Sequence, residues 1–221
     1  MSEKRMTIGV LAHVDAGKTT LTEQLLCHGG ALRQAGSVDR GTARTDFLSV
    51  ERERGISVRT STAVLEYQGM ELNLIDTPGH VDFAAEVERS LSVLDMAVLV
   101  ISAVEGVQAQ TEILYEALCR AGVRVVFFIN KIDRVGSRWQ EVAQEIREQF
   151  TPHAVVCSRV CGEETRECSA AACSFIEEEF AAQVLDEVSA FNEDIMEAYL
   201  EEGSVPPEKL ERAFAGCVAK G

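Results

Sequence analysis

Three short segments of the chain carry residue types that suit the binding of a nucleoside triphosphate: residues 12–19 (AHVDAGKT), 76–80 (DTPGH) and 130–133 (NKID). In the first segment, Gly17 lets backbone N–H groups approach a phosphate, and Lys18 can reach the outer phosphates. The hydroxyl of Thr19 can bind Mg²⁺. Ala12 stands where such a loop usually has its first glycine. A glycine-containing turn without function is the alternative, and the Lys-Thr pair argues against it.

The second segment follows an apolar run and supplies groups for the metal and for water. Asp76 can hold Mg²⁺ through a water, and the N–H of Gly79 can bind the γ-phosphate. His80 can orient an attacking water because its two ring nitrogens offer a donor and an acceptor. The alternative for His80 is a histidine at a helix start on a mobile loop.

The third segment selects the base. Asp133 can accept hydrogen bonds from two N–H groups on the edge of guanine, while Asn130 and Lys131 brace the loop and cover the ring. Adenine presents the opposite donor pattern and would leave a buried carboxylate unpaired. The segment therefore predicts GTP rather than ATP.

A long polar stretch separates the first two segments and ends in residues 49–57 (SVERERGIS). A loop of this length without periodicity is more often functional than structural. Ser57 could complete the Mg²⁺ shell while the γ-phosphate is present, and loss of that phosphate would release the loop, as in GTPase switches. Helix capping by Ser57 or a solvated run of charges is the alternative.

These interpretations give one predicted set of site residues, with GTP or GDP and Mg²⁺ as ligands. His80 is the predicted catalytic residue. The predicted metal ligands are Thr19, Ser57 and, through a water, Asp76. The predicted nucleotide-binding residues are Ala12, His13, Val14, Asp15, Ala16, Gly17, Lys18, Thr19, Thr20, Asp76, Gly79, Asn130, Lys131 and Asp133.

Together these segments resemble the translational GTPases of the elongation factor G group, in which such segments recur with an Arg-Gly-Ile-Ser/Thr sequence. Residues 36–46, 89–95 and 106–111 look most like the tetracycline-resistance ribosomal protection proteins within that group. The resemblance is strong from Thr7 to Phe150 and weak beyond.

The resemblance implies roles for several residues. His80 matches a catalytic histidine that an RNA loop of the large ribosomal subunit draws over the attacking water. Val14 and Ile56 match apolar residues that gate this histidine. Asp15 matches an aspartate close to the phosphates, and Ser57 stands where most relatives have threonine.

Alternation and short apolar runs predict the elements that position these segments. The expected strands are Met6–Leu11, Thr60–Tyr67, Met70–Ile75, Met96–Ile101, Arg124–Ile129 and, more weakly, Ala154–Val160. Helices are expected over Thr19–Cys27, Gln110–Arg120 and Arg138–Phe150, and a mostly helical pattern runs from Ala170 to Phe214 with breaks at Gly203 and Pro206-Pro207.

These elements predict an α/β fold: a doubly wound P-loop GTPase domain with a mostly parallel sheet and helices on both faces. We expect a core GTP-binding domain over residues 1–155 and a helical insertion over 156–221. Relatives close the guanine site with a Ser-Ala-Lys/Leu loop after a final strand, which this sequence lacks. We therefore expect an N-terminal fragment of a longer factor, ending before its last strand.

Composition limits the other classes. The formal net charge is −15, and residues 151–221 hold 15 Asp and Glu against 5 Lys and Arg, so RNA attraction must come from elsewhere or from basic ribosomal proteins. No apolar run is long enough to cross a membrane. We expect a cytoplasmic monomer that binds the ribosome but neither membrane nor DNA.

Four of the seven cysteines, Cys157, Cys161, Cys168 and Cys173, fall close together without Cys-x-x-Cys spacing, which favours reduced thiols over a zinc site.

Three functions remain open from the sequence. The first is a ribosome-dependent GTPase of the tetracycline-resistance type. An elongation factor G or release-factor type of GTPase would share the same chemistry. The third is a nucleotide-binding fragment without activity, because an incomplete sheet exposes an edge and apolar surface.

Overall fold

The computed structural model describes residues 4–31, 61–76 and 91–220 of the chain. It divides into two compact units, residues 1–131 and 132–221, and each is described here by itself. Within the described ranges, no helix combines the length and the apolar character needed to cross a membrane.

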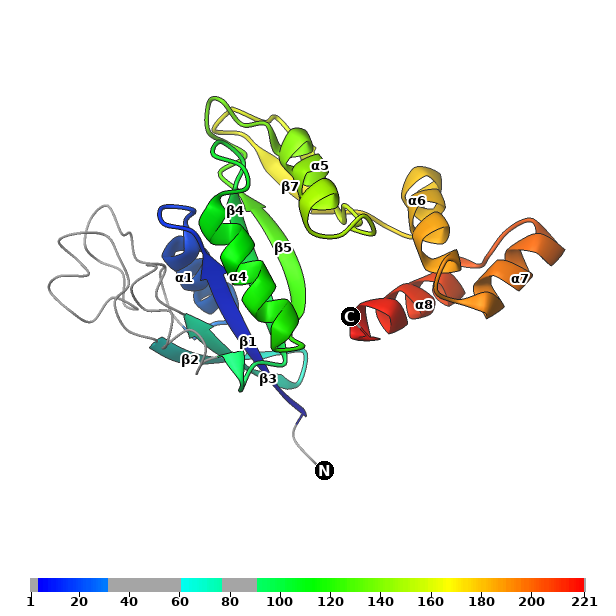
Figure 1. Cartoon of the computed structure of the whole chain (residues 1–221), viewed down its shortest axis with the longest axis horizontal. Coiled ribbons are helices and arrows are strands. Elements are labelled where there is room, and N and C mark those ends of the chain that lie inside the picture. The colour runs from blue at the N-terminus through cyan, green and yellow to red at the C-terminus, as the bar shows by residue number, and fades with distance from the viewer. Residues whose placement is uncertain (1–3, 32–60, 77–90, 221) are drawn as a thin grey trace, which may run out of the picture. The chain divides into compact units, whose positions relative to one another are not determined.

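The first unit is built on a five-stranded sheet in the order β2-β3-β1-β4-β5 (Figure 1). Its strands are β1 (Lys4–Ala12), β2 (Ser61–Tyr67), β3 (Met70–Asp76), β4 (Met96–Ser102) and β5 (Arg124–Asn130). Neighbouring strands are parallel except for β2, which pairs antiparallel with β3. Parallel pairing brings the carboxyl ends of β1, β3, β4 and β5 to one edge of the sheet.

The antiparallel pair is a tight hairpin. Tyr67 pairs with Met70, so the two residues between them form the whole turn. Gln68 and Gly69 have φ values of 50° and 73°. Positive φ at both central residues is the type I′ geometry, which matches the twist of the strands that it joins.

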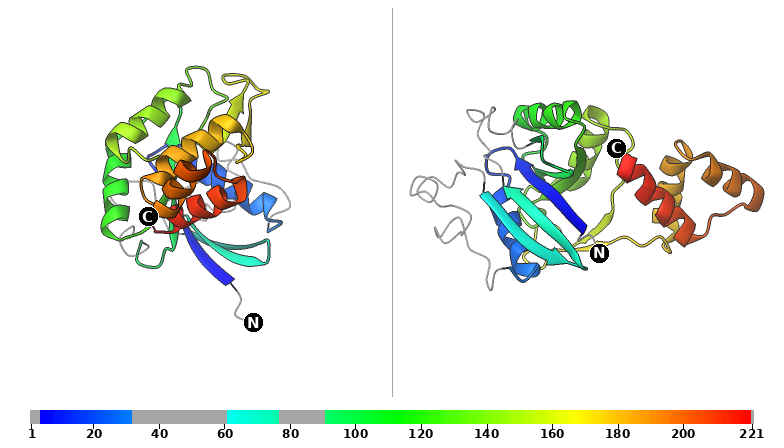
Figure 2. Two further views of the ribbon diagram at one scale, coloured as in Figure 1. Left: turned by 90° about the vertical axis from the view of Figure 1, so that its right-hand side faces the viewer. Right: turned by 90° about the horizontal axis from the view of Figure 1, so that it is seen from below.

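Helices α1 (Lys18–His28) and α4 (Ala109–Arg120) cover opposite faces of this sheet (Figure 2). Leu114 and Leu118 of α4 pack in a cluster with Leu11 of β1. On the other side, Leu21 of α1 packs with Val10. Because successive residues of a strand point to opposite faces, the neighbours Val10 and Leu11 place the two helices on different sides.

The second unit contains four helices and a small sheet. They are α5 (Trp139–Gln149), β6 (Ser158–Cys161), β7 (Ser169–Ala172), α6 (Glu178–Ser189), α7 (Glu193–Glu202) and α8 (Pro207–Lys220). The last three helices share an apolar core (Figure 2). Its buried side chains are Phe180, Val184, Val188, Ile195 and Leu210.

The α/β fold with a mostly parallel sheet and helices on both faces is confirmed, and the predicted strands and helices up to residue 150 are present wherever the structure describes them. Beyond that point the bounds differ. The strand expected over Ala154–Val160 is present as β6, but it begins only at Ser158. The mostly helical pattern expected from Ala170 to Phe214 is present as α6, α7 and α8, but strand β7 occupies its first residues. Alanines favour a helix locally, but pairing with β6 overrides that weak preference. The domain division expected after residue 155 stays a prediction; the compact units meet between Lys131 and Ile132.

Candidate nucleotide-binding site

The loop between β1 and α1 has a backbone shaped for an anion. Asp15 and Gly17 have φ values of 63° and 94°, and the N–H of Ala16 donates to the carbonyl of His13 at 3.3 Å. Left-handed residues beside right-handed ones turn successive N–H groups toward one point, a concave arrangement that binds anions. No side chain caps the start of α1, and its first turn holds no acidic residue. The positive end of the helix dipole therefore adds to the attraction for a phosphate.

Gly17 is required at its position. Its φ value is unfavourable for a side chain, and an added Cβ would lie 2.3 Å from Nδ2 of Asn130. The absence of a side chain thus allows the loop to pass directly under the end of β5. Two of the three predicted segments meet at this contact.

Asn130 makes this junction with a hydrogen bond. Its Nδ2 donates to the carbonyl of Ala16 at 2.8 Å, although 114 positions separate the two residues in the chain. Lys131 follows with a left-handed φ of 63°, which turns the chain away from the strand. The sheet topology explains the encounter, because β1 and β5 both end at the same edge.

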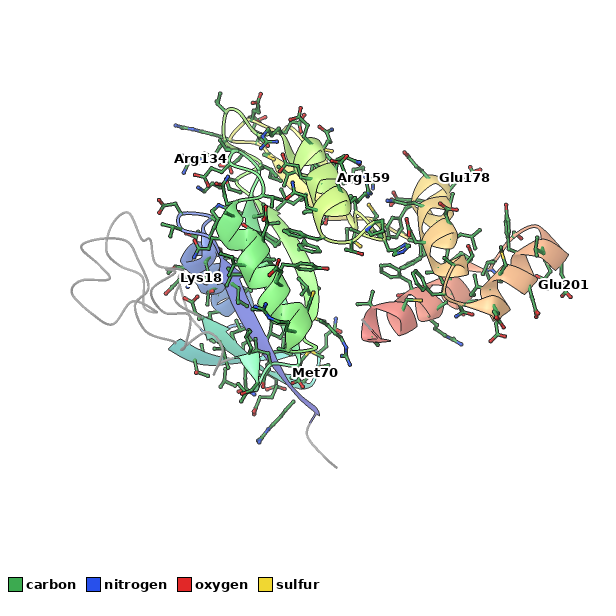
Figure 3. The ribbon with its side chains drawn as sticks, viewed as in Figure 1. Lys18, Met70, Arg134, Arg159, Glu178 and Glu201 are labelled. Atoms are coloured by element: carbon green, nitrogen blue, oxygen red, sulfur yellow. The ribbon has the colours of Figure 1, made fainter. Side chains whose placement is uncertain are left out.

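Lys18 and Asp76 form a buried ion pair at this edge. Figure 3 labels Lys18 on α1. Lys18 begins α1 and is 7% exposed; Asp76 ends β3 and is 2% exposed. The ammonium nitrogen of Lys18 donates to Oδ1 of Asp76. A buried cation and a buried carboxylate side by side are the donor set that a phosphate and a metal ion would share, so these residues fit both ligands.

His13 belongs to a polar cluster that the sequence did not reveal. It is 6% exposed, its Nδ1 lies 3.3 Å from Oγ1 of Thr111, and its Nε2 lies 3.1 Å from Oε2 of Glu105. The same oxygen of Glu105 lies 4.0 Å from Nζ of Lys131. Glu105 therefore bridges the first and third predicted segments.

The bridge is reflected in the acidity of Glu105. Burial acts to raise the pKa of this carboxyl, but the hydrogen bond with His13 and the positive charge of Lys131 outweigh burial and lower the pKa below its ordinary value. The side chain of Gln110 adds a further link, since its Oε1 accepts from the N–H of Val14 at 3.3 Å. Residues 106–111 supported the family resemblance, yet nothing in their pattern indicated contact with the phosphate loop.

Asp133 lies in the second unit. Its carboxylate is half exposed and lies 4.0 Å from Nε of Arg134. The backbone around it is fixed from the same unit: Glu164 N–H donates to the carbonyl of Ile132 at 3.0 Å, and Gly136 N–H donates to Oε1 of Glu164 at 2.6 Å. The carboxylate of Glu164 is thus a support for this segment that sequence reasoning missed.

The remaining predicted residues fall into two groups. Thr19 and Thr20 lie in the first turn of α1, and Ala12 and Ala16 are buried beside it. Ser57, Gly79 and His80 lie outside the described residues, as does Ile56.

Comparison with known proteins gives one family and several relatives. Residues 3–206 match the family described as elongation factor Tu GTP binding domain. The chain is 48% identical over 206 residues to an oxytetracycline resistance protein of Streptomyces rimosus, covering 93% of this chain and 31% of that protein. It is 47% identical over 211 residues to the tetracycline resistance protein TetM from transposon Tn916 of Enterococcus faecalis, covering 95% and 32%.

TetW, a tetracycline resistance protein of Butyrivibrio fibrisolvens, is 44% identical over 209 residues, covering 95% of this chain and 32% of TetW. The chain thus spans about a third of the length of these relatives. A solved crystal structure of a Thermus thermophilus protein matches with a TM-score of 0.86 and 29% identity, over 98% of this chain and 36% of that one.

Proposed function

Because the chain belongs to the elongation factor Tu GTP-binding domain family, we propose that it binds GTP and hydrolyses it to GDP and phosphate. The β1–α1 loop and Lys18 bind the phosphates, and Asn130, Lys131 and Asp133 recognise guanine. Water attacks the γ-phosphorus, the bond to the β–γ bridging oxygen breaks, and GDP leaves with that electron pair. One proton of the water stays on the phosphate product and the other passes to solvent. His80 orients the water for this attack.

The observation that best supports this proposal is the hydrogen bond from Asn130 to Ala16. A nucleotide has its phosphates and its base at opposite ends, so a site needs a phosphate loop and a base-recognising segment held side by side. This bond joins the backbone of the phosphate loop to the first residue of the predicted guanine segment. A turn without function would not need that junction.

Mg²⁺ would be held by Thr19, by Ser57 and, through a water, by Asp76, and it would neutralise charge on the phosphates. Asp76 supports this role because its buried carboxylate lies next to the phosphate-binding lysine.

For the whole protein, we propose a ribosome-dependent GTPase of the tetracycline-resistance type that works in the cytoplasm. Identities of 44–48% to proteins named for tetracycline resistance support this function over that of an elongation or release factor. The partner is the ribosome, through its large-subunit RNA loop and ribosomal proteins. Since this chain has a net charge of −15, attraction to RNA must come from other parts of the protein or from basic ribosomal proteins.

GTP turnover by the full-length protein, measured with and without ribosomes, tests the proposal. We expect strong stimulation by ribosomes, and its absence would refute a ribosome-dependent enzyme. His80→Ala should bind GTP normally and lose the stimulated turnover. Asp133→Ala should reduce the preference for guanine over adenine nucleotides; an unchanged preference removes Asp133 from base recognition.

A further inference from the structure

The β6–β7 hairpin of the second unit has a cysteine at the open end of each strand. Ser158 pairs with Ala172 in its antiparallel register. Extending the ladder by one position sets Cys157 opposite Cys173. A backbone hydrogen bond confirms the extension, because the N–H of Cys173 donates to the carbonyl of Cys157 at 2.9 Å.

The two cysteine side chains lie on the same face of the hairpin. Directly opposed residues of an antiparallel pair share a face, as do alternate residues along a strand, so Cys157, Cys173 and Arg159 lie on one face of the hairpin. A hydrogen-bonded antiparallel pair has its Cα atoms about 5.5 Å apart. Disulfides span Cα separations of about 4.4–6.8 Å, so the Cα separation of this pair lies within their range. The Cβ atoms of a hydrogen-bonded pair lie about 5.5 Å apart and must approach to about 3.5–4.5 Å, so the bridge would be strained and easily reduced.

The state of the thiols agrees with this arrangement. Both are free thiols, Cys157 being exposed and Cys173 half-buried. Burial of its sulfur raises the pKa of Cys157, and the charge of the neighbouring Cys173 raises this pKa further.

The other two cysteines of the hairpin are arranged differently. Cys161 pairs with Ser169 and therefore does not lie opposite Cys168. Cys168 precedes Ser169 by one residue, beside the turn. In the described part of the chain, no three His, Cys, Asp or Glu side chains gather as a metal site would require. The hairpin therefore offers one directly opposed dithiol.

We propose that Cys157 and Cys173 form a reversible thiol–disulfide couple that closes the open end of the β6–β7 hairpin. The oxidant is a low-molecular-weight disulfide such as oxidised glutathione. One cysteine thiolate attacks a sulfur of the oxidant and releases one glutathione thiolate; the other cysteine thiolate then attacks the mixed disulfide and releases the second. The two cysteine protons pass to water or buffer, and two electrons reduce the oxidant to two thiols.

The closed hairpin would steady the segment that carries Asp133. The hairpin turn supplies Glu164, whose N–H binds the carbonyl of Ile132 and whose carboxylate binds the N–H of Gly136. Separation of β6 from β7 frees this turn, and a disulfide between Cys157 and Cys173 resists that separation. The link to guanine recognition rests on the proposed function; the disulfide and the steadying effect do not.

Peptide mass spectrometry after treatment of the reduced chain with oxidised glutathione tests the couple. We expect a cross-link between Cys157 and Cys173 that dithiothreitol removes. Cys157→Ser should form none, while Cys161→Ser, a matched control on the same strand, should still form it. Stable glutathione adducts without a cross-link, or a cross-link through Cys161 or Cys168 instead, would overturn the proposal.

Hydrogen exchange of residues 132–136, measured without nucleotide, tests the steadying effect. Oxidation should slow exchange at Gly136 about tenfold or more in the native chain and leave it unchanged in Cys157→Ser. Equal exchange rates in the reduced and cross-linked chain would refute the coupling. Failure to bind GTP would refute the proposed function alone, because neither measurement uses nucleotide.

Discussion

Replacing Asn130 with alanine tests whether the junction between β5 and the phosphate loop sets nucleotide affinity. The change removes the 2.8 Å bond to the carbonyl of Ala16, a residue with no exposed surface. A hydrogen bond contributes about 0.5–1.5 kcal/mol net, and a buried carbonyl left without this donor costs about 1–3 kcal/mol. If this cost falls on the phosphate-binding conformation of the loop, the free energy of GDP binding weakens by about 1–3 kcal/mol. Affinity for GDP then falls roughly 5- to 150-fold.

Calorimetric titration with GDP, with thermal unfolding in parallel, measures this effect. Asn130→Asp provides a second variant of the same shape, in which the donor is replaced by an acceptor facing a carbonyl, so its affinity should fall at least as far. Asn192→Ala is the matched control. Asn192 also binds a backbone group, the N–H of Ile195 at 3.3 Å, but it caps α7.

The control should lose about 1 kcal/mol of stability, as cap removal does, and keep its affinity for GDP. If Asn130→Ala folds and binds GDP within twofold of the native chain, the junction does not order the phosphate loop and the reasoning is wrong.

Three further predictions concern the first unit. Asp76→Ala should lower the free energy of unfolding by about 3–5 kcal/mol in urea titrations, because it leaves the buried charge of Lys18 without its carboxylate, and a loss below about 1 kcal/mol would contradict the buried pair. Leu118→Ala should cost about 2–5 kcal/mol in the same assay, whereas Ile113→Ala, on the exposed side of the same helix, should change stability by about 0.5 kcal/mol or less. Glu105 has a folded-state pKa below its ordinary value of 4.5, so its contribution to stability is present above that pH and is lost as the pH falls through the folded-state pKa. Comparison of Glu105→Gln with the native chain in urea at pH about 7 and about 3 should therefore show a larger stability difference at the higher pH.

The sequence predicted the sheet well because its strands are coded locally. Runs such as Met96–Ser102 are short and mostly apolar. Strands β3 and β5 end at the predicted site residues Asp76 and Asn130. Patterns of this kind depend on near neighbours in the chain, so they can be read before the fold is known. The turn at Gln68 and Gly69 lies between two predicted strands, Thr60–Tyr67 and Met70–Ile75.

The contacts that were missed depend on the fold itself. Glu105 approaches His13 and Lys131 only because β1, β4 and β5 end at one edge, and a glutamate after a strand has no local mark of that meeting. The sequence pattern missed strand β7 for a related reason. Its alanines carry a helix preference of a few tenths of a kcal/mol, and only the partner strand decides against it.

The strand order has a consequence for how the chain is made. Of the strands in the described part of the chain, β1 is synthesised before the others, yet it lies in the middle of the sheet between β3 and β4. At about 5–20 residues per second, a ribosome needs roughly 3–13 seconds after completing β1 to complete β3, and longer for β4. During that time β1 lacks β3 and β4, its two neighbours in the finished sheet. The central strand therefore waits for both of its neighbours, and chaperones that bind extended apolar segments can bind it in the meantime.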